Sequence, residues 1–335
     1  MNSPAVQGFM RKLIALLLLV IPAAGQQTAP ALPMDDATRI REFYRVASAI
    51  QDGIWPGWSS VPAPLILVTP DTEFLTHHPA PPKEMQKVGD DVYARSRQFP
   101  VNFQATFPAF GPPAIIVVGQ SANTASKTST PWLFTVMHEH FHQLQWAQPR
   151  YLESVNGLGL GHGDTSGMWM LNYPFPYEKP EVAQAFSHLR DLLLSALNET
   201  NQGTFEKQAK EYLEQRKKFF AQLSADDHKY FGFQLWQEGI ARYTEVRSAE
   251  AAAQYHSTTE FAALPDYEPF ASYAARARAN TLNELKQADL PTWKRTVVYS
   301  FGAAEGFLLD RIHPKWRAHY FQQMLSTDSY FEAEE

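Results

Sequence analysis

The segment from Thr130 to Gln145 constrains the fold of this chain more than any other stretch, because it contains His138-Glu139-x-x-His142. Residues four apart lie on one face of a helix, so the two imidazoles can reach the same metal ion. Glu139 lies about 100° round the helix from His138, close enough to reach a water on that metal without being a ligand. The pattern therefore predicts a helix that carries two ligands of a metal site.

The residues around the motif favour a helix. Thr130 suits the N-cap and Pro131 suits the first helical position. Apolar residues then recur at helical spacing and predict a stripe that faces the core: Leu133, Met137, Phe141 and Leu144. His140 lies about 200° from His138, beside this stripe, and is predicted to be a packed histidine rather than a ligand. The alternative is that the motif histidines are also only packed or solvated.

Composition limits the classes of protein that fit. The chain has 335 residues, 44% hydrophobic, which is enough for a large core and one or two domains. The net charge of −6 offers no basic field, so no nucleic-acid partner is expected. There is no cysteine, which excludes a cysteine nucleophile and cysteine-based zinc sites. Any metal must be held by histidine and carboxylate.

The N-terminus has the pattern of an export signal. Arg11 and Lys12 precede a nine-residue apolar run, 13–21, and small residues lead to Gly25. We therefore expect a signal peptide at 1–25. The run is short for a bilayer span, although an uncleaved anchor is the alternative. Because no second long apolar run follows, we expect a soluble exported protein, periplasmic or secreted, with no stable membrane span after cleavage.

The rest of the chain predicts an α+β fold, with a small mixed sheet packed on the motif helix and a mainly helical C-terminal half. Residues 26–34 suit a linker, and 35–150 an α/β part with a helix at 35–50, strands at 65–68 and 114–119, and one or two strands within 91–107. Residues 151–335 form the mainly helical part. Its predicted helices are 181–198, 204–223, 225–248, 272–288 and 299–311.

The segment 151–180 breaks this regularity. Its glycines alternate with aromatic residues, which argues against a regular helix. It either lines a cleft with aromatic faces or is a surface loop packed on the core. His162 lies within it, where it could bind substrate or an oxyanion, or simply be solvated.

A catalytic zinc site usually has three protein ligands, so two histidines are incomplete. The best third ligand is Glu238, on a predicted helix capped by Ser224 and Asp227. Gly232 and Gly239 are seven residues apart, nearly on one face, so another backbone could come close there, and Glu238 is next to this face. The alternative for Glu238 is an exposed ion pair with Arg242 at i+4.

Glu245 shares the face of Glu238, seven residues on. It could orient a ligand histidine through the free ring nitrogen, or be a solvated helix charge.

His138-Glu139-x-x-His142 followed by Gln237-Glu238-x-x-Ala241 resembles the gluzincin metallopeptidases, the thermolysin-like and aminopeptidase-like clan. The resemblance covers the two motif helices and the strand before them. It implies Zn²⁺ held by both histidines and Glu238, with Glu139 as the general base. Gln237 departs from the common Asn, and the gap of 96 residues (238 − 142) implies an inserted segment. The Gly-x-Met-Glu-Asn segment of the aminopeptidases is missing, which weakens an aminopeptidase interpretation.

Tyr299 is a second catalytic candidate, since a tyrosine donates to the tetrahedral intermediate in several gluzincins. The plainer interpretation is a buried tyrosine whose hydroxyl is satisfied. Together these features predict an exported zinc peptidase that acts on a peptide or protein substrate. Two alternatives stay open: a gluzincin-like protein that binds zinc or peptide without hydrolysis, and a zinc hydrolase of a non-peptide bond.

Overall fold

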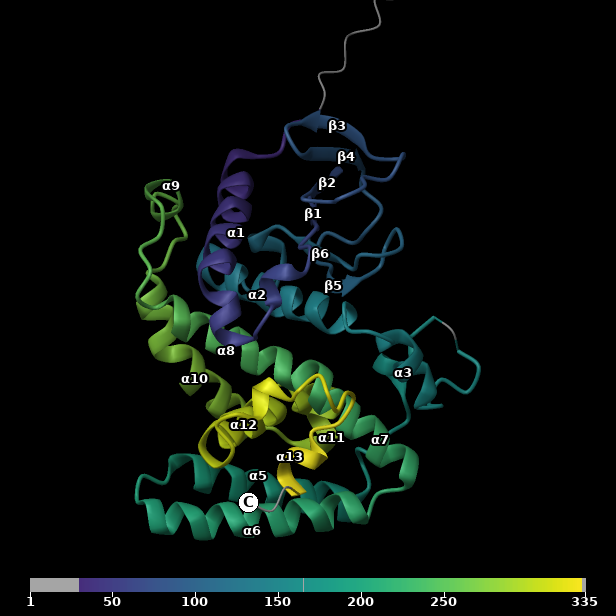
Figure 1. Cartoon of the computed structure of the whole chain (residues 1–335), viewed down its shortest axis with the longest axis vertical. Coiled ribbons are helices and arrows are strands. Elements are labelled where there is room, and N and C mark those ends of the chain that lie inside the picture. The colour runs from purple at the N-terminus through teal and green to yellow at the C-terminus, as the bar shows by residue number, and fades with distance from the viewer. Residues whose placement is uncertain (1–29, 165, 333–335) are drawn as a thin grey trace, which may run out of the picture.

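The structure is a computed structural model that describes residues 30–164 and 166–332. The predicted signal peptide, 1–25, and the first part of the predicted linker, up to residue 29, lie outside the described residues. The fold is α+β, with a small sheet in the N-terminal half and helices in most of the C-terminal half (Figure 1). The fold class predicted from the sequence is confirmed.

The sheet has six strands in the order β3-β4-β2-β1-β6-β5. Only β1 and β6 run parallel, and every other neighbouring pair is antiparallel. The strands are β1 (Leu65–Val68), β2 (Thr72–Thr76), β3 (Gln86–Gly89), β4 (Val92–Ser96), β5 (Gln104–Phe107) and β6 (Ile115–Gly119). The strands predicted at 65–68 and 114–119 are confirmed, and 91–107 contains two strands, β4 and β5.

The central strands β1 and β6 are buried along their whole length. Alternate side chains divide between two apolar clusters, because successive residues of a strand point to opposite faces. Leu65 and Leu67 join the large core that the helices share, whereas Ile66 and Val68 join a smaller cluster on the other face. A continuous apolar run is the sequence pattern of a strand that is covered on both sides.

Strands β2 and β3 were not predicted from the sequence. β3 is a polar and largely exposed edge strand, so no apolar alternation marks it. β2 contains Glu73, which is fully buried and breaks the apolar pattern. Its carboxylate accepts from Arg95 Nε on the neighbouring β4 at 2.7 Å and from the backbone N–H groups of Gln98 and Phe99 at 2.6 Å each.

Glu73→Gln is expected to lower the free energy of unfolding by about 3–5 kcal/mol, because it leaves the largely covered guanidinium of Arg95 without its counter-charge. Urea denaturation followed by circular dichroism measures the change. Glu84→Gln, at an exposed glutamate nearby, is the matched control and should change stability by less than about 0.5 kcal/mol. Equal midpoints for the two variants would show that the buried pair contributes nothing.

The longer helices are α1 (Met34–Ile54), α2 (Ser129–Trp146), α5 (Pro180–Asn198), α6 (Gln202–Ala221), α7 (Ala225–Gln234), α8 (Ile240–Ala252), α10 (Phe270–Gln287) and α12 (Val297–Ile312). The short ones are α3 (Tyr151–Gly157), α4 (Trp169–Asn172), α9 (Thr259–Ala262), α11 (Leu290–Trp293) and α13 (Asp328–Glu332). All six helices predicted outside the motif are present, with ends shifted by up to four residues. The helix predicted at 225–248 is interrupted by a π-helical turn, η3 (Leu235–Gly239).

The predicted start of the motif helix was wrong. Thr128 is the N-cap, α2 begins at Ser129, and Pro131 is therefore the third helical residue. Proline is accepted there because the first four N–H groups of a helix have no intrahelical partner. The hydroxyl of Thr130 instead donates to the carbonyl oxygen of Glu268 at 2.6 Å, which fastens α2 to the segment before α10.

The prediction that 151–180 contains no regular helix was also wrong in part. Residues 151–156 hold no glycine and form α3, which ends at Gly157. Gly159, Gly163 and Gly167 have positive φ angles, and the chain there turns irregularly before the short α4. In Figure 1, this segment projects beside the helical half.

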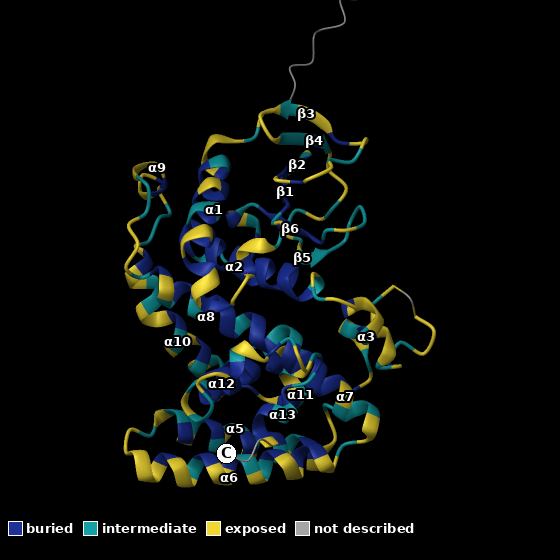
Figure 2. Ribbon diagram, viewed as in Figure 1, coloured by how far each residue is buried: buried dark blue, intermediate teal, exposed yellow. Residues whose placement is uncertain are grey.

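Helix α2 lies between the sheet and the helices of the C-terminal half and is almost entirely buried (Figures 1 and 2). It packs on β5 and β6, and it also contacts α1 and α8. This position places the motif at the centre of the molecule, where both halves can contribute to one site. Among the described residues, no helix combines the length and the hydropathy that crossing a membrane requires.

Candidate metal centre

His138, His142 and Glu238 converge although 96 residues separate the second from the third. The two Nε2 atoms are 3.2 Å apart. Glu238 Oε2 lies 3.4 Å from His142 Nε2 and 3.8 Å from His138 Nε2. Within the described part of the chain, these residues form the group whose ligand atoms can hold a metal ion, all within 4.8 Å of one another. The three ligands predicted from the sequence are therefore brought together.

The donor set is compatible with zinc, although histidine and carboxylate ligands also accept other divalent metals. With Zn–N and Zn–O distances of about 2.0–2.2 Å, the ligand atoms of a tetrahedral site are separated by about 3.3–3.5 Å. The observed separations of 3.2, 3.4 and 3.8 Å lie close to this range. Two imidazoles and one carboxylate are also the ligand types of a catalytic zinc site, which keeps a fourth position open.

The π-helical turn η3 carries Glu238 between α7 and α8. Such turns inside α-helices occur frequently at functional sites, because the extra residue changes the direction of one side chain. Gly239 lets α12 pack directly behind this turn, since a Cβ at this position would lie 2.6 Å from Gly302 Cα. The predicted close approach of a backbone is confirmed at Gly239 but not at Gly232, where the atoms within reach belong to the side chain of Ser326. Ser224 caps α7 as predicted, accepting from the N–H of Asp227 at 3.1 Å.

Each of the two histidines has a side chain beside its other nitrogen. His142 Nδ1 donates to Gln145 Oε1 at 2.7 Å, whereas His138 Nδ1 is buried without a hydrogen-bond partner among the described residues and lies 3.4 Å from Glu245 Oε2. A proton on each Nδ1 leaves both Nε2 lone pairs free for a cation. Gln145 also donates to the carbonyl oxygen of Trp236, so it ties α2 to the turn that carries Glu238.

Glu245 thus lies on the Nδ1 side of His138 and is buried, so it is not the solvated helix charge of the second alternative. Its other oxygen accepts from Arg242 at 2.9 Å, and Arg242 pairs further with Glu284 at 3.0 Å. Arg242 therefore pairs with Glu245 and Glu284, and the ion pair with Glu238 predicted as an alternative is not among its contacts in the described structure.

The charges at the centre favour a cation. Burial disfavours the imidazolium of His138, but the carboxylates of Glu238 and Glu245 outweigh burial and raise the pKa of His138 to about 9. Burial likewise opposes the ionised form of Glu238, yet the two histidines hold the pKa of its carboxyl well below the usual range. The three groups therefore stabilise positive charge between them. A divalent cation and a proton compete for this position.

Glu139 is buried beside the ligands and is held by two side chains of the edge strand β5. The Thr106 hydroxyl donates to Glu139 Oε2 at 2.8 Å and shares its one proton with the Glu139 carbonyl oxygen at 3.0 Å, and Gln104 Nε2 donates to Oε1 at 3.3 Å. Residues 104 and 106 lie on the same face of the strand, so β5 presents both donors to α2. The carboxylate is therefore fixed against β5, close enough to His138 for its charge to raise the pKa of that histidine.

Tyr299 lies at the same centre, with its ring centroid 6.2 Å from that of His138. Arg295 donates to the Tyr299 hydroxyl at 3.2 Å, and its Nη1 lies 3.7 Å from Glu238 Oε1. Burial and the Glu238 carboxylate raise the pKa of Tyr299, so the phenol stays protonated. Arginine can only donate, so the hydroxyl proton of Tyr299 remains available to another acceptor.

Of the two other histidines considered in the sequence, one is packed and one is exposed. His140 is buried, stacks on Trp58, and hydrogen-bonds Gln143 at 2.8 Å and Gln51 at 2.9 Å, which confirms that it is packed. Burial lowers the pKa of His140 to about 4. His162 is exposed on its loop.

Comparison of this chain with protein-family models, with curated proteins and with solved structures gave no match. The sequence prediction missed four side chains that complete the site: Gln104, Thr106, Gln145 and Arg295. Only Gln145 has a local signal, because it lies one helical turn after His142 and can reach its ring. The others come from strands and helices distant in sequence.

Proposed function

We propose that this chain is an exported zinc-dependent peptidase. The observation that carries the proposal is the convergence of His138, His142 and Glu238, with the Glu139 carboxylate held by β5 within the electrostatic reach of His138. A bound Zn²⁺ would lower the pKa of a water from 15.7 towards about 7 and polarise the carbonyl of the bond to be cleaved.

Glu139 has the position of the general base. Its carboxylate would take the proton of the attacking water and then deliver it to the leaving amine. Thr106 and Gln104 keep both of its oxygens in place, which reduces the reorganisation needed during proton transfer.

Tyr299 and Arg295 would stabilise the oxyanion. The Tyr299 hydroxyl accepts from Arg295 and keeps its own proton for donation to a developing negative charge. Arg295 contributes a positive charge close to Glu238 without being able to lose a proton.

A peptide substrate is supported by the position of β5. Among the described strands, β5 has β6 on one side and no neighbour on the other. Its Thr106 contacts Glu139, so the open edge runs beside the proposed base. An extended peptide could pair with such an edge through backbone hydrogen bonds, which would bring its carbonyl groups past the metal centre.

Thr106→Val is expected to lower kcat at least about tenfold with little change in KM, because a hydrogen bond to a charged group contributes about 1.5–3 kcal/mol and 1.36 kcal/mol is tenfold in rate. Steady-state kinetics on a fluorogenic peptide measure the split. Thr106→Ser restores the hydroxyl and should recover most of the rate, with zinc content unchanged in both variants. If kcat/KM falls only because KM rises, Thr106 would instead be assigned to substrate binding.

The proposed function is tested by digestion of casein with the purified protein. Activity should be lost in 1,10-phenanthroline and recover when zinc is added back. Elemental mass spectrometry should find about one zinc per chain. Zinc without digestion of casein or a peptide library would favour the binding protein without hydrolysis, and turnover only on ester or glycan panels would favour the non-peptide hydrolase.

A further inference from the structure

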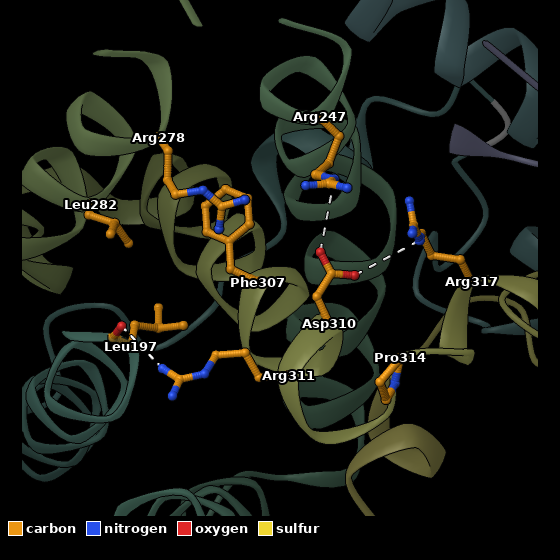
Figure 3. Close-up of a pocket in the computed structure, with 9 residues that line it drawn as sticks. All are labelled: Leu197, Arg247, Arg278, Leu282, Phe307, Asp310, Arg311, Pro314 and Arg317. Atoms are coloured by element: carbon orange, nitrogen blue, oxygen red, sulfur yellow. Dashed lines mark hydrogen bonds and ion pairs between the residues drawn. The ribbon is translucent and has the colours of Figure 1, made fainter. Parts of the chain in front are cut away.

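A second charged cluster lies away from the metal centre. Arg247 follows Glu245 by two residues, about 200° round α8, so it points away from His138. It lines a cavity of about 410 Å³ together with three other arginines. Figure 3 shows the four, which come from α8, α10, α12 and the segment after α12: Arg247, Arg278, Arg311 and Arg317.

The cluster has an excess of positive charge. Two carboxylates pair with these arginines in the described structure, Glu250 with Arg247 and Arg278, and Asp310 with Arg247 and Arg317. Four guanidinium groups and two carboxylates give a formal charge of +2 (4 − 2). The whole chain carries −6, so this cavity is a local reversal of the charge of the protein.

Two of the arginines are held rigidly. The guanidinium of Arg278 stacks 3.9 Å from the ring centroid of Phe307, and that of Arg311 stacks 3.5 Å from that of Phe205. Arg311 also donates to the carbonyl oxygens of Ala196 and Leu197, which end α5. An arginine that is already fixed loses little side-chain entropy when an anion binds it.

Two donors around Asp310 have spare capacity. Arg247 Nε is buried without a hydrogen-bond partner among the described residues, 4.0 Å from Asp310 Oδ2. Arg317 Nε lies 3.9 Å from Oδ1. Both distances exceed a hydrogen bond, and Asp310 instead accepts from Tyr243 Oη at 2.8 Å and Trp316 Nε1 at 3.1 Å. Figure 3 shows Asp310 between the two guanidinium groups.

We propose that this cavity binds a phosphate group, through Arg247, Arg278 and Arg317. A phosphate dianion balances the excess charge of +2, and its oxygens match the donor forks of arginine. The cavity volume also admits the organic part of a small phosphate monoester. This site is independent of the proposed peptidase activity.

Isothermal titration calorimetry with inorganic phosphate, at an ionic strength held constant with KCl, tests the proposal. The protein is first stripped with a chelator and dialysed, so that phosphate bound to metal is not counted. We expect the Arg247→Gln/Arg317→Gln double variant to bind phosphate at least about tenfold more weakly than the wild type. Arg150→Gln, at an exposed arginine paired with Glu153, is the matched control and should bind as the wild type does.

Asp310→Asn should change phosphate affinity in the opposite direction, because it keeps an acceptor for Tyr243 and removes a negative charge that repels phosphate. We expect this variant to bind phosphate several-fold more tightly, a result that damage to the fold would not produce. Glycerol phosphate in place of inorganic phosphate distinguishes a monoester site from a site for the free ion, and succinate tests the preference for phosphate over a dicarboxylate. Equal affinities in the wild type and the double variant, no binding by the wild type, or tighter binding of succinate would overturn the proposal.

Discussion

Glu238→Ala is expected to weaken zinc binding more than about a hundredfold. Loss of a residue that only hydrogen-bonds a ligand lowers metal affinity about 10–100-fold, and Glu238 would be a direct ligand. The remaining site would hold two imidazoles, without the carboxylate that lies 3.4 Å from His142 Nε2. Competition with a zinc-binding dye measures the affinity, and elemental mass spectrometry measures the zinc retained after dialysis. Glu153→Ala, at an exposed glutamate of α3, is the control.

Two outcomes of that experiment lead in different directions. If Glu238→Ala and His142→Ala both lose zinc while Glu153→Ala retains it, the three-ligand site is established. If Glu238→Ala retains zinc at wild-type affinity, another group must be the third ligand. Glu245 is then the first to substitute, since its carboxylate lies 3.4 Å from His138 Nδ1.

The parts of the site that could be predicted are those that local spacing determines. His138 and His142 share a helix face because they are four residues apart, and the apolar stripe beside them shows which face is buried. The strands β1 and β6 were equally visible as continuous apolar runs. In each case, neighbouring residues in the sequence carry the whole pattern.

What could not be predicted depends on contacts between distant segments. Thr106 meets Glu139 only because β5 is the edge strand packed on α2, and no spacing in the sequence links the two. Arg295 approaches Glu238 across 57 residues (295 − 238). The π-helical turn is also invisible to a 3.6-residue pattern, and so is the packing of its Gly239 against Gly302.

A buried charge explains why strand β2 was not predicted from the sequence. β2 has a fully buried glutamate at its second residue, so a hydrophobic pattern rejects it. Glu73 is acceptable there only because Arg95 lies opposite it on β4, which requires knowledge of the register. A prediction from sequence alone has no means to find this partner.

Glu139→Gln is expected to lower kcat about 10²- to 10⁴-fold, the range that a general base contributes. Glutamine keeps the shape of the side chain and can still accept from Thr106, but it cannot take a proton from water. Zinc content should stay at about one per chain, since Glu139 is not among the three ligand residues. Single-turnover kinetics on a fluorogenic peptide, with the Glu153→Gln variant as the control, measure the chemical step.

Measuring zinc content and turnover together in Glu139→Gln decides whether Glu139 is the general base. Retained zinc with lost turnover assigns the proton transfer to Glu139, because the metal site and its two histidines are then intact. Unchanged turnover would remove Glu139 as the base and leave its two hydrogen bonds to β5 with a structural role only. Loss of zinc would make Glu139 part of the metal site itself and contradict the proposal, in which Glu238 is the third ligand beside His138 and His142.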